Sequence, residues 1–199
     1  MTFMSHDAPR PWITLATEVL GTYPIFELTR SHQRSQSTGR EHQFLRLQAP
    51  DWVNVVAVTE RGDMVLVEQY RHGTDDITLE IPGGAVDPGE DAATTAAREL
   101  EEETGYRGSE LIEIGRVAPN PAFLSNRCWT FLALDCRKVG GQELDPSEEI
   151  TVRFAPLGSF GKLIDRGSIT HSLVIVAHDH LMRGIRRGAE WAQRLALQP

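Results

Sequence analysis

Three glutamates of this chain, Glu99, Glu102 and Glu103, have the types and the spacing to do chemistry together. They lie in residues 90–104, a segment without Gly or Pro that is rich in the helix formers Ala, Glu and Leu. Positions i, i+3 and i+4 of a helix share a neighbouring face, so the three carboxylates would repel one another. A hard divalent cation such as Mg²⁺ prefers oxygen ligands and relieves this repulsion. The spacing therefore predicts a metal site, and the alternative is a solvated acidic helix face.

The residues around these glutamates are predicted to hold the helix in place. Ala93, Ala97 and Leu100 recur at helical spacing and form a narrow apolar stripe that allows close packing on a sheet. The glycine pair that precedes the segment lets the backbone approach a metal closely, so the Gly83 carbonyl is a further candidate ligand.

The same residues belong to a longer motif between Gly84 and Tyr106. Every fixed position of the pattern G-x5-E-x7-R-E-U-x-E-E-x-G-U, in which U is apolar, is filled, and Tyr106 is the only soft match. On this motif the chain resembles the Nudix hydrolases, which cleave a nucleoside diphosphate linked to another group. The resemblance implies an α/β fold, an α/β/α sandwich with a mixed sheet. It also implies that Arg98 holds Glu90 and Glu102 in ligating rotamers, and a plain surface arginine is the alternative.

The composition is that of an ordinary globular protein with a core. The chain has 199 residues, of which 40% are hydrophobic and 24% are charged. Its net charge of −8, without a compensating basic stripe, argues against a nucleic-acid partner. Cys128 and Cys136 are too few for a disulfide framework or a zinc site, so we expect two reduced, buried thiols. No signal peptide and no run of transmembrane length are evident, so we expect a cytoplasmic protein without a membrane partner.

The chain is expected to comprise a strand segment at residues 1–50 and a Nudix catalytic domain at residues 51–199. In the first, residues 17–20 and 23–28 alternate apolar with polar side chains, which predicts antiparallel strands. Residues 31–41 are polar and are expected to form a loop or the tip of a hairpin. In the second, strands are expected near residues 53–58, 64–69, 77–81, 111–117 and 127–136.

The tail after residue 157 is predicted to be helical, with a break at Gly167-Ser168. Ser168 is a candidate N-cap for a helix over residues 169–182. His171, His178 and His180 fall on that helix, and we expect them to be packed or surface residues rather than metal ligands.

Segments outside the motif resemble the ADP-ribose pyrophosphatase branch of the Nudix family and its relatives that act on nucleoside diphosphate sugars. Residues 66–71 resemble the strand that enters the substrate cleft, and residues 79–84 resemble the lead into the motif. Residues 145–150 resemble the acidic loop that supplies the catalytic base. In this comparison Glu68 lies at the substrate cleft, and Arg71 is a suitable bidentate partner for a phosphate.

The acidic loop supplies the candidates for the general base, which must reach the attacking water from outside the metal cluster. Glu148 is the first candidate and Glu149 the second, and Glu102 is the next if neither serves. A solvated acidic turn is the alternative for this loop. The expected cofactor is Mg²⁺, or Mn²⁺, which neutralises phosphate oxygens and lowers the pKa of a bound water.

One segment departs from the ADP-ribose branch. Many hydrolases of that branch follow a proline with Gly and place a Glu five residues beyond it, whereas Ala122 and Asn126 stand at these positions after Pro121. Asn126 can hydrogen-bond a sugar or a phosphate but cannot act as a base. The expected substrate class is therefore the nucleoside diphosphate sugars, with ADP-ribose as the first choice.

Two other functions stay open from the sequence. One is hydrolysis of nucleoside triphosphates or dinucleoside polyphosphates, although compact triphosphate hydrolases usually lack the 68–71 segment and the N-terminal strands. The other is a non-catalytic Nudix-like module that senses a nucleotide, although this chain keeps all the carboxylates of the motif. Members of the resembled branch dimerise by exchanging N-terminal strands, so we expect a homodimer formed through residues 17–47.

Overall fold

The computed structural model describes residues 8–195, which divide into two compact units. The N-terminal unit holds the chain up to Pro50 together with Asn120–Asn126. The core unit holds Asp51–Pro119 and the chain from Arg127 onward.

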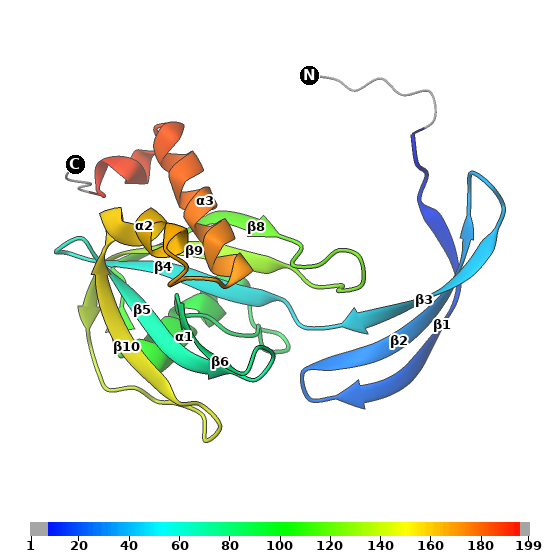
Figure 1. Cartoon of the computed structure of the whole chain (residues 1–199), viewed down its shortest axis with the longest axis horizontal. Helices are drawn as coiled ribbons and strands as arrows, with labels where there is room; N and C mark the ends of the chain where they lie inside the picture. Colours follow the sequence, from blue (N-terminus) through cyan, green and yellow to red (C-terminus); the bar gives the residue numbers. More distant parts are fainter. Residues whose placement is uncertain (1–7, 196–199) are drawn as a thin grey trace. The chain divides into compact units, whose positions relative to one another are not determined.

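The N-terminal unit is a three-stranded antiparallel sheet of β1 (Trp12–Tyr23), β2 (Phe26–Ser35) and β3 (Glu41–Gln48), shown in blue and cyan in Figure 1. The expected antiparallel strands are present, but residues 23–28 are divided between them, because a turn after Tyr23 separates β1 from β2. The hairpin tip expected at residues 31–41 is present between β2 and β3, but it is shorter, since β2 runs to Ser35 and β3 begins at Glu41. Ser31 and Ser35 are small polar residues that suggested a loop, yet both are buried in β2.

The core unit is built on a seven-stranded sheet. Its order is β10-β5-β4-β9-β7, while β6 pairs with β5 and β8 pairs with β9. The strands are β4 (Trp52–Thr59), β5 (Asp63–Arg71), β6 (Asp76–Glu80), β7 (Tyr106–Arg107), β8 (Glu110–Val117), β9 (Cys128–Lys138) and β10 (Ile150–Pro156). The pair β4–β9 is parallel and the other pairs are antiparallel, which confirms the expected mixed sheet. Strands β7 and β10 were not predicted, and β10 begins where the sequence suggested only an acidic loop.

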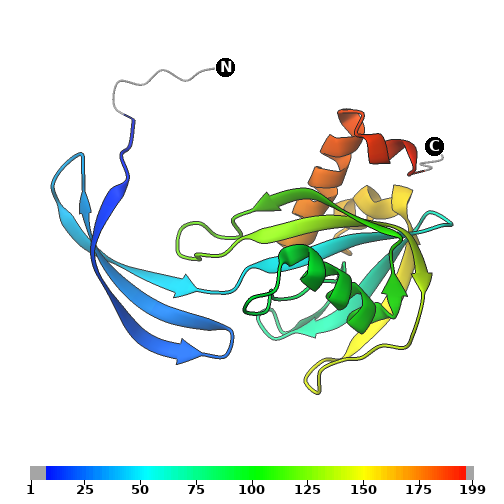
Figure 2. The ribbon, with the colours of Figure 1, turned by 180° about the vertical axis from the view of Figure 1, so that it is seen from behind.

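Helices cover both faces of this sheet, as Figures 1 and 2 show. Helix α1 (Ala92–Thr104) lies on one face, and α2 (Phe160–Asp165) and α3 (Ser172–Arg186) lie on the other. Alternate residues of β4 serve the two layers, because successive side chains of a strand point to opposite faces. Val53, Val55 and Ala57 pack with α1, and Val56 and Val58 pack with α2 and α3. The α/β/α sandwich is therefore confirmed.

Helix α1 begins and ends at well-defined caps. The Asp91 side chain accepts the backbone N–H groups of Ala93 and Thr94, both at 3.0 Å, which satisfies donors that have no partner inside the helix. Gly105 ends the helix in the left-handed region, with φ 74°. The predicted apolar stripe is wrong, since Ala93 and Ala97 are exposed.

The face of α1 that meets the sheet carries Thr95, Ala96, Leu100 and Glu103 instead. Glutamate carboxylates are therefore turned toward the protein and not toward solvent. This rotation matters for the site, because it brings charged groups of the helix against the glycine loop.

The C-terminal part of the core unit follows the predicted break at Gly167-Ser168. The predicted cap is wrong, because α3 begins at Ser172 and its N-cap is His171, whose Nδ1 accepts the Leu173 N–H at 3.2 Å. Ser168 lies in the loop, where its hydroxyl oxygen accepts from Arg166. A final 3-10 helix, η2 (Glu190–Gln193), follows α3, and a second one, η1 (Leu157–Ser159), precedes α2.

Candidate active site

Glu99 and Glu103 of α1 face the glycine pair that follows β6. The Gly83 N–H donates to Oε2 of Glu103 at 2.9 Å. A Cβ added at Gly84 would stand 2.4 Å from Oε1 of Glu99, and one added at Gly83 would stand 2.2 Å from the Val53 carbonyl oxygen. Only glycine fits at Gly83, because the clash there is with backbone, whereas a side chain at Gly84 would displace the Glu99 carboxylate. The backbone of this loop therefore lies directly against two carboxylates.

Both carboxylates are unfavourable as charges in the protein alone. Burial raises the pKa of Glu99 to about 7 and that of Glu103 to about 8. The negative charge of Glu148 also raises the pKa of each of them, by less than burial does. A bound cation would remove the cost of ionising both groups.

The donors present are all oxygens, which suits a hard divalent cation. The carbonyl oxygens of Pro82 and Gly84 accept the N–H groups of Val55 and Val53, respectively. Among the described residues the carbonyl of Gly83 accepts no hydrogen bond. It remains available as a ligand beside Glu103.

The side chains do not converge as a finished ligand set. Among residues 8–195, no three carboxylate, imidazole or thiolate groups gather in a metal-binding arrangement. Glu102 is turned to Arg98, with 2.8 Å between its Oε2 and Nη1 of the arginine. Glu99 is also held by Arg98, at 3.1 Å. The predicted set of Gly83, Glu99, Glu102 and Glu103 therefore stays a prediction.

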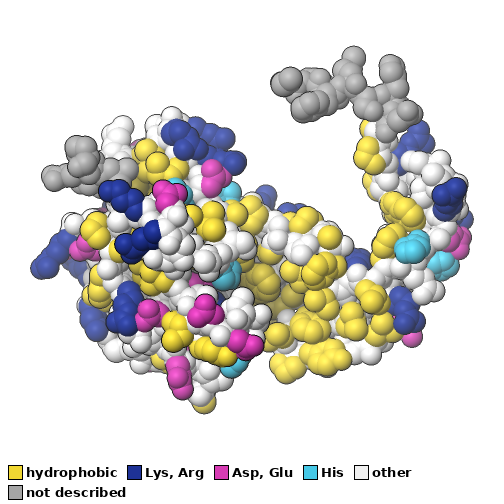
Figure 3. All heavy atoms as spheres, viewed as in Figure 1, with side chains coloured by type: hydrophobic (Ala, Val, Ile, Leu, Met, Phe, Trp, Pro, Cys, Tyr) yellow, Lys and Arg dark blue, Asp and Glu magenta, His cyan; other side chains and the backbone are white. Residues whose placement is uncertain are grey.

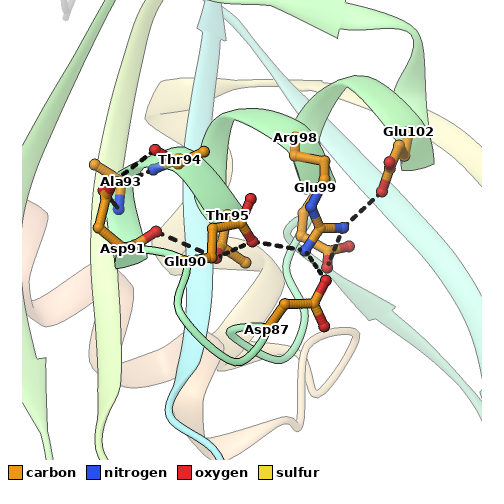
Figure 4. A network of polar contacts seen from close by, with 9 residues as sticks. All are labelled: Asp87, Glu90, Asp91, Ala93, Thr94, Thr95, Arg98, Glu99 and Glu102. Carbon is orange, nitrogen blue, oxygen red and sulfur yellow. Dashed lines mark hydrogen bonds and ion pairs between the residues drawn. The ribbon is translucent and has the colours of Figure 1, made fainter.

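Arg98 lies among four carboxylates, as Figure 4 shows. Besides Glu99 and Glu102, its guanidinium contacts Glu90 at 3.2 Å and Asp87 at 3.6 Å. Oε2 of Glu90 also accepts from the Thr95 hydroxyl at 2.7 Å. The arginine thus links the turn before α1 to two turns of the helix, and both Glu90 and Glu102 depend on it for their orientation.

Arg71, at the end of β5, is paired with a residue that the sequence reasoning missed. Nε and Nη2 of Arg71 donate to the two carboxylate oxygens of Glu80, at 2.7 and 2.8 Å. Glu80 is buried between Leu79 and Ile81 in the lead to the glycine pair. A charged residue inside an apolar strand was the available signal, because such a residue needs a partner.

The other predicted site residues have different surroundings. Glu68 is bound to Arg153, with 2.6 Å between Nη2 and Oε2. Asn126 is buried in the N-terminal unit, where its Nδ2 donates to the Pro50 carbonyl at 2.9 Å. Glu148 accepts the Asp145 N–H at 3.1 Å, while Glu149, the next residue, is exposed and has no such contact among the described residues. The roles predicted for Glu68, Asn126, Glu148 and Glu149 therefore stay predictions.

Of two cavities in the described part of the core unit, only the smaller one is lined by predicted site residues. One of about 200 Å³ is lined by Arg98 and Glu102 together with Glu101 and the 140–143 segment. The larger cavity, of about 480 Å³, is lined by Asp63 at the start of β5, whereas Arg71 lies at the other end of that strand. None of the predicted site residues lines this cavity. Size alone does not locate the chemistry here, so the carboxylates and Arg71 define the candidate site.

Comparison with known proteins agrees with the motif. The NUDIX domain family matches residues 50–174. An ADP-ribose pyrophosphatase of Bacillus subtilis is 33% identical over 133 residues, which cover 66% of this chain and 72% of that protein. An ADP-ribose pyrophosphatase of Mycobacterium tuberculosis is 31% identical over 164 residues, which cover 81% of this chain and 79% of that protein.

A solved structure described as an ADP compounds hydrolase superposes on this chain with a TM-score of 0.80 and 20% sequence identity. The superposition covers 92% of this chain and 98% of the chain in that structure. That likeness shows the fold. No helix among residues 8–195 is long and apolar enough to cross a membrane. With the motif, the matched domain and the fold in agreement, the chain belongs to the Nudix family.

Proposed function

We propose that this chain is a metal-dependent hydrolase that cleaves the diphosphate of ADP-ribose or a related nucleoside diphosphate sugar. The products would be a nucleoside monophosphate and a sugar phosphate. The observation that carries the proposal is a pair of carboxylates, the buried Glu103 and the partly buried Glu99, that lie against the glycine loop. The names of the two bacterial relatives, both ADP-ribose pyrophosphatases, support the substrate class.

The residues of the site divide into those that hold the metal and those that meet the substrate. Glu99, Glu103, Glu102 and the Gly83 carbonyl would hold Mg²⁺ or Mn²⁺, with Arg98 orienting Glu102 and Glu90. When bound, the metal supplies neutralisation of the phosphate charge and a water of lowered pKa. Arg71 keeps N–H donors that Glu80 does not use, and these suit phosphate oxygens.

Glu148 is the proposed general base, ahead of Glu149. Its negative charge raises the pKa of Glu99 and of Glu103, which supports a role close to the residues that would hold the metal and the attacking water. It sits on the loop before β10 and outside α1, which leaves it free to accept a proton. Glu102 is a poorer candidate, because its carboxylate is already bound to Arg98.

We further propose that the N-terminal unit pairs with a second copy of the chain. Its sheet exposes large apolar residues, among them Val19, Tyr23, Ile25 and Leu45 at 55%, 51%, 72% and 57%. Figure 3 shows hydrophobic side chains gathered on this unit. A three-stranded sheet with such a surface gains stability when another sheet covers it. The cytoplasmic location expected from the sequence stays a prediction.

A substrate panel with product identification tests the function. Purified protein is incubated with Mg²⁺ and ADP-ribose, other nucleoside diphosphate sugars, nucleoside triphosphates and dinucleoside polyphosphates, and the products are separated by chromatography. We expect AMP and ribose 5-phosphate from ADP-ribose, and strongly reduced turnover with Glu103→Gln. Preferred cleavage of triphosphates or dinucleoside polyphosphates would contradict the substrate class. Nucleotide binding without hydrolysis would instead indicate a sensing module.

A further inference from the structure

The Arg71–Glu80 pair has one buried and one accessible member. The Glu80 side chain is 4% exposed, whereas the Arg71 side chain is 41% exposed. The carboxylate is therefore part of the interior, and the guanidinium extends from it toward solvent. Such an arrangement fixes the position of an arginine without covering it.

Glu80 is itself held from two directions. Its Oε1 accepts the Thr78 hydroxyl at 2.6 Å, from the same strand, β6. Its Oε2 lies 3.9 Å from Nε2 of His171, the residue that caps α3. Because Nδ1 of His171 accepts the Leu173 N–H, the proton of the neutral ring lies on Nε2, which faces Glu80. These contacts leave the carboxylate little freedom to turn.

The geometry of the pair leaves one edge of the guanidinium free. A guanidinium has five N–H donors in a rigid plane. Glu80 takes the side edge, formed by Nε and Nη2. The end edge, formed by Nη1 and the second N–H of Nη2, makes no hydrogen bond among the described residues. This end edge is a two-donor fork of the shape that binds two oxygens of one phosphate.

We infer that Glu80 is a positioning residue for the hydrolysis proposed above: it holds Arg71 by the side edge so that the end edge binds a phosphate of the substrate. The inference rests on the proposed function for its reaction. Glu80 does not touch the substrate, and it acts through Arg71 alone. The bond between them should therefore govern phosphate binding and leave metal binding unchanged.

The test is a double-mutant cycle with Arg71→Ala, Glu80→Gln and the double variant, measured by steady-state kinetics on ADP-ribose. Gln has the shape of Glu but only one oxygen to accept from the guanidinium. We expect Glu80→Gln to raise KM roughly tenfold to hundredfold with a smaller change in kcat. In the Arg71→Ala background the same change should have no further effect on KM.

A matched control comes from Glu101 and Arg107, which form a pair with the same side-edge geometry at 2.8 Å for each bond. Glu101→Gln breaks that pair, and KM should stay at the wild-type value. Affinity for Mn²⁺, measured by calorimetry without substrate, should be equal in the wild type, Glu80→Gln and Glu101→Gln. Glu80→Asp keeps both oxygens and should recover part of the loss if the protein tolerates the shorter chain.

Two results would overturn the inference. One is an equal rise in KM when Glu80→Gln is made in the wild type and in Arg71→Ala. The other is a Glu80→Gln protein that melts far below the wild type but keeps its KM, since this would reduce Glu80 to a structural role. Binding of inorganic pyrophosphate in the presence of Mg²⁺ separates this inference from the proposed function. A protein that hydrolyses no nucleoside diphosphate sugar, yet loses pyrophosphate affinity in Glu80→Gln and Arg71→Ala alike, would refute the function and keep the positioning role.

Discussion

The carboxylate of Glu103 accepts the backbone N–H of Gly83, a residue twenty positions earlier in the chain, at 2.9 Å. This hydrogen bond joins helix α1 to the glycine loop that precedes it. It fixes one oxygen of Glu103 and leaves the other for a metal. Because Glu103 is almost fully buried, water has little access to replace this hydrogen bond.

Replacing Glu103 with Gln should therefore remove most metal-dependent activity. An amide is a poorer ligand than a carboxylate for a hard cation, and the Gly83 N–H can still bond to the amide oxygen. We expect at least a roughly hundredfold loss at limiting Mg²⁺, by analogy with the loss of other orienting groups of metal sites. Titration of activity with Mg²⁺ measures this, with Glu101→Gln as the control on the same helix. Near-normal turnover of Glu103→Gln at limiting Mg²⁺ would rule out the metal assignment.

The base assignment predicts a different pattern for the acidic loop. Glu148→Gln should lower kcat by roughly two to four orders of magnitude, because the loop residue acts in the transition state. Metal affinity and KM should change little. Glu149→Gln is the matched control, as a neighbouring glutamate of the same loop whose charge is not among the causes of the raised pKa of Glu99 or Glu103. A severe loss in Glu149→Gln alone would move the role by one residue.

The glycine loop should tolerate no side chain. In Gly83→Ala the new Cβ would stand 2.2 Å from the Val53 carbonyl oxygen, which is backbone and cannot swing away. We expect a loss of roughly 1–3 kcal/mol in the free energy of unfolding, together with reduced activity. Gly158→Ala is the control, since its Cβ would meet nothing within 4 Å. Urea denaturation of both variants checks the prediction, and equal stability of the two would contradict the close approach.

The stability of the protein should depend on pH through a histidine of α3. Burial lowers the pKa of His178 below its ordinary value of 6.5, and its ring lies 4.9 Å from that of Phe160. A histidine whose pKa is lower in the folded state than in the unfolded state stabilises the fold at pH values above its unfolded pKa. That contribution is lost as the pH falls from about 6.5 toward the folded value.

The melting temperature should accordingly fall between about pH 7.5 and pH 5.5. His178→Phe keeps an aromatic ring against Phe160 but cannot be protonated, so the decrease should be smaller in this variant. His180→Phe tests a second histidine, whose pKa burial also lowers. Parallel pH profiles of the wild type and His178→Phe would show that this group does not contribute.

The assembly proposal predicts a dimer in solution. Light scattering after size exclusion should give twice the 22.2 kDa of one chain. Val19→Glu places a charge on the exposed sheet of the N-terminal unit and should shift the population toward monomer. Val139→Glu is the matched control, because Val139 is similarly exposed at 51% but lies outside that unit. A wild-type protein that is monomeric and fully active would refute the proposal.

Much of the core unit was predictable because its signals are local. The strands β4, β5, β6, β8 and β9 and the helix α1 follow from short-range patterns of apolar residues and from helix propensity. The contacts of Arg98 with Glu90 and Glu102 are equally local, since they span one or two turns of α1 and the turn before it. The wrong helix cap also came from a local pattern. Ser168 is a favourable N-cap residue, but the loop after α2 continues to His171, which is the N-cap of α3.

What the sequence determined by itself was the family motif, the kind of fold and the set of carboxylates that could hold a metal. What only the tertiary structure decided was which of these groups meet. The rotation of α1 buries Glu103 against Gly83, and the pairing of β5 with β6 sets Arg71 beside Glu80. Within the N-terminal unit, Asn126 donates to the carbonyl of Pro50, a residue far from it in the sequence. These relationships depend on long-range packing and strand register, which no local pattern of residues encodes.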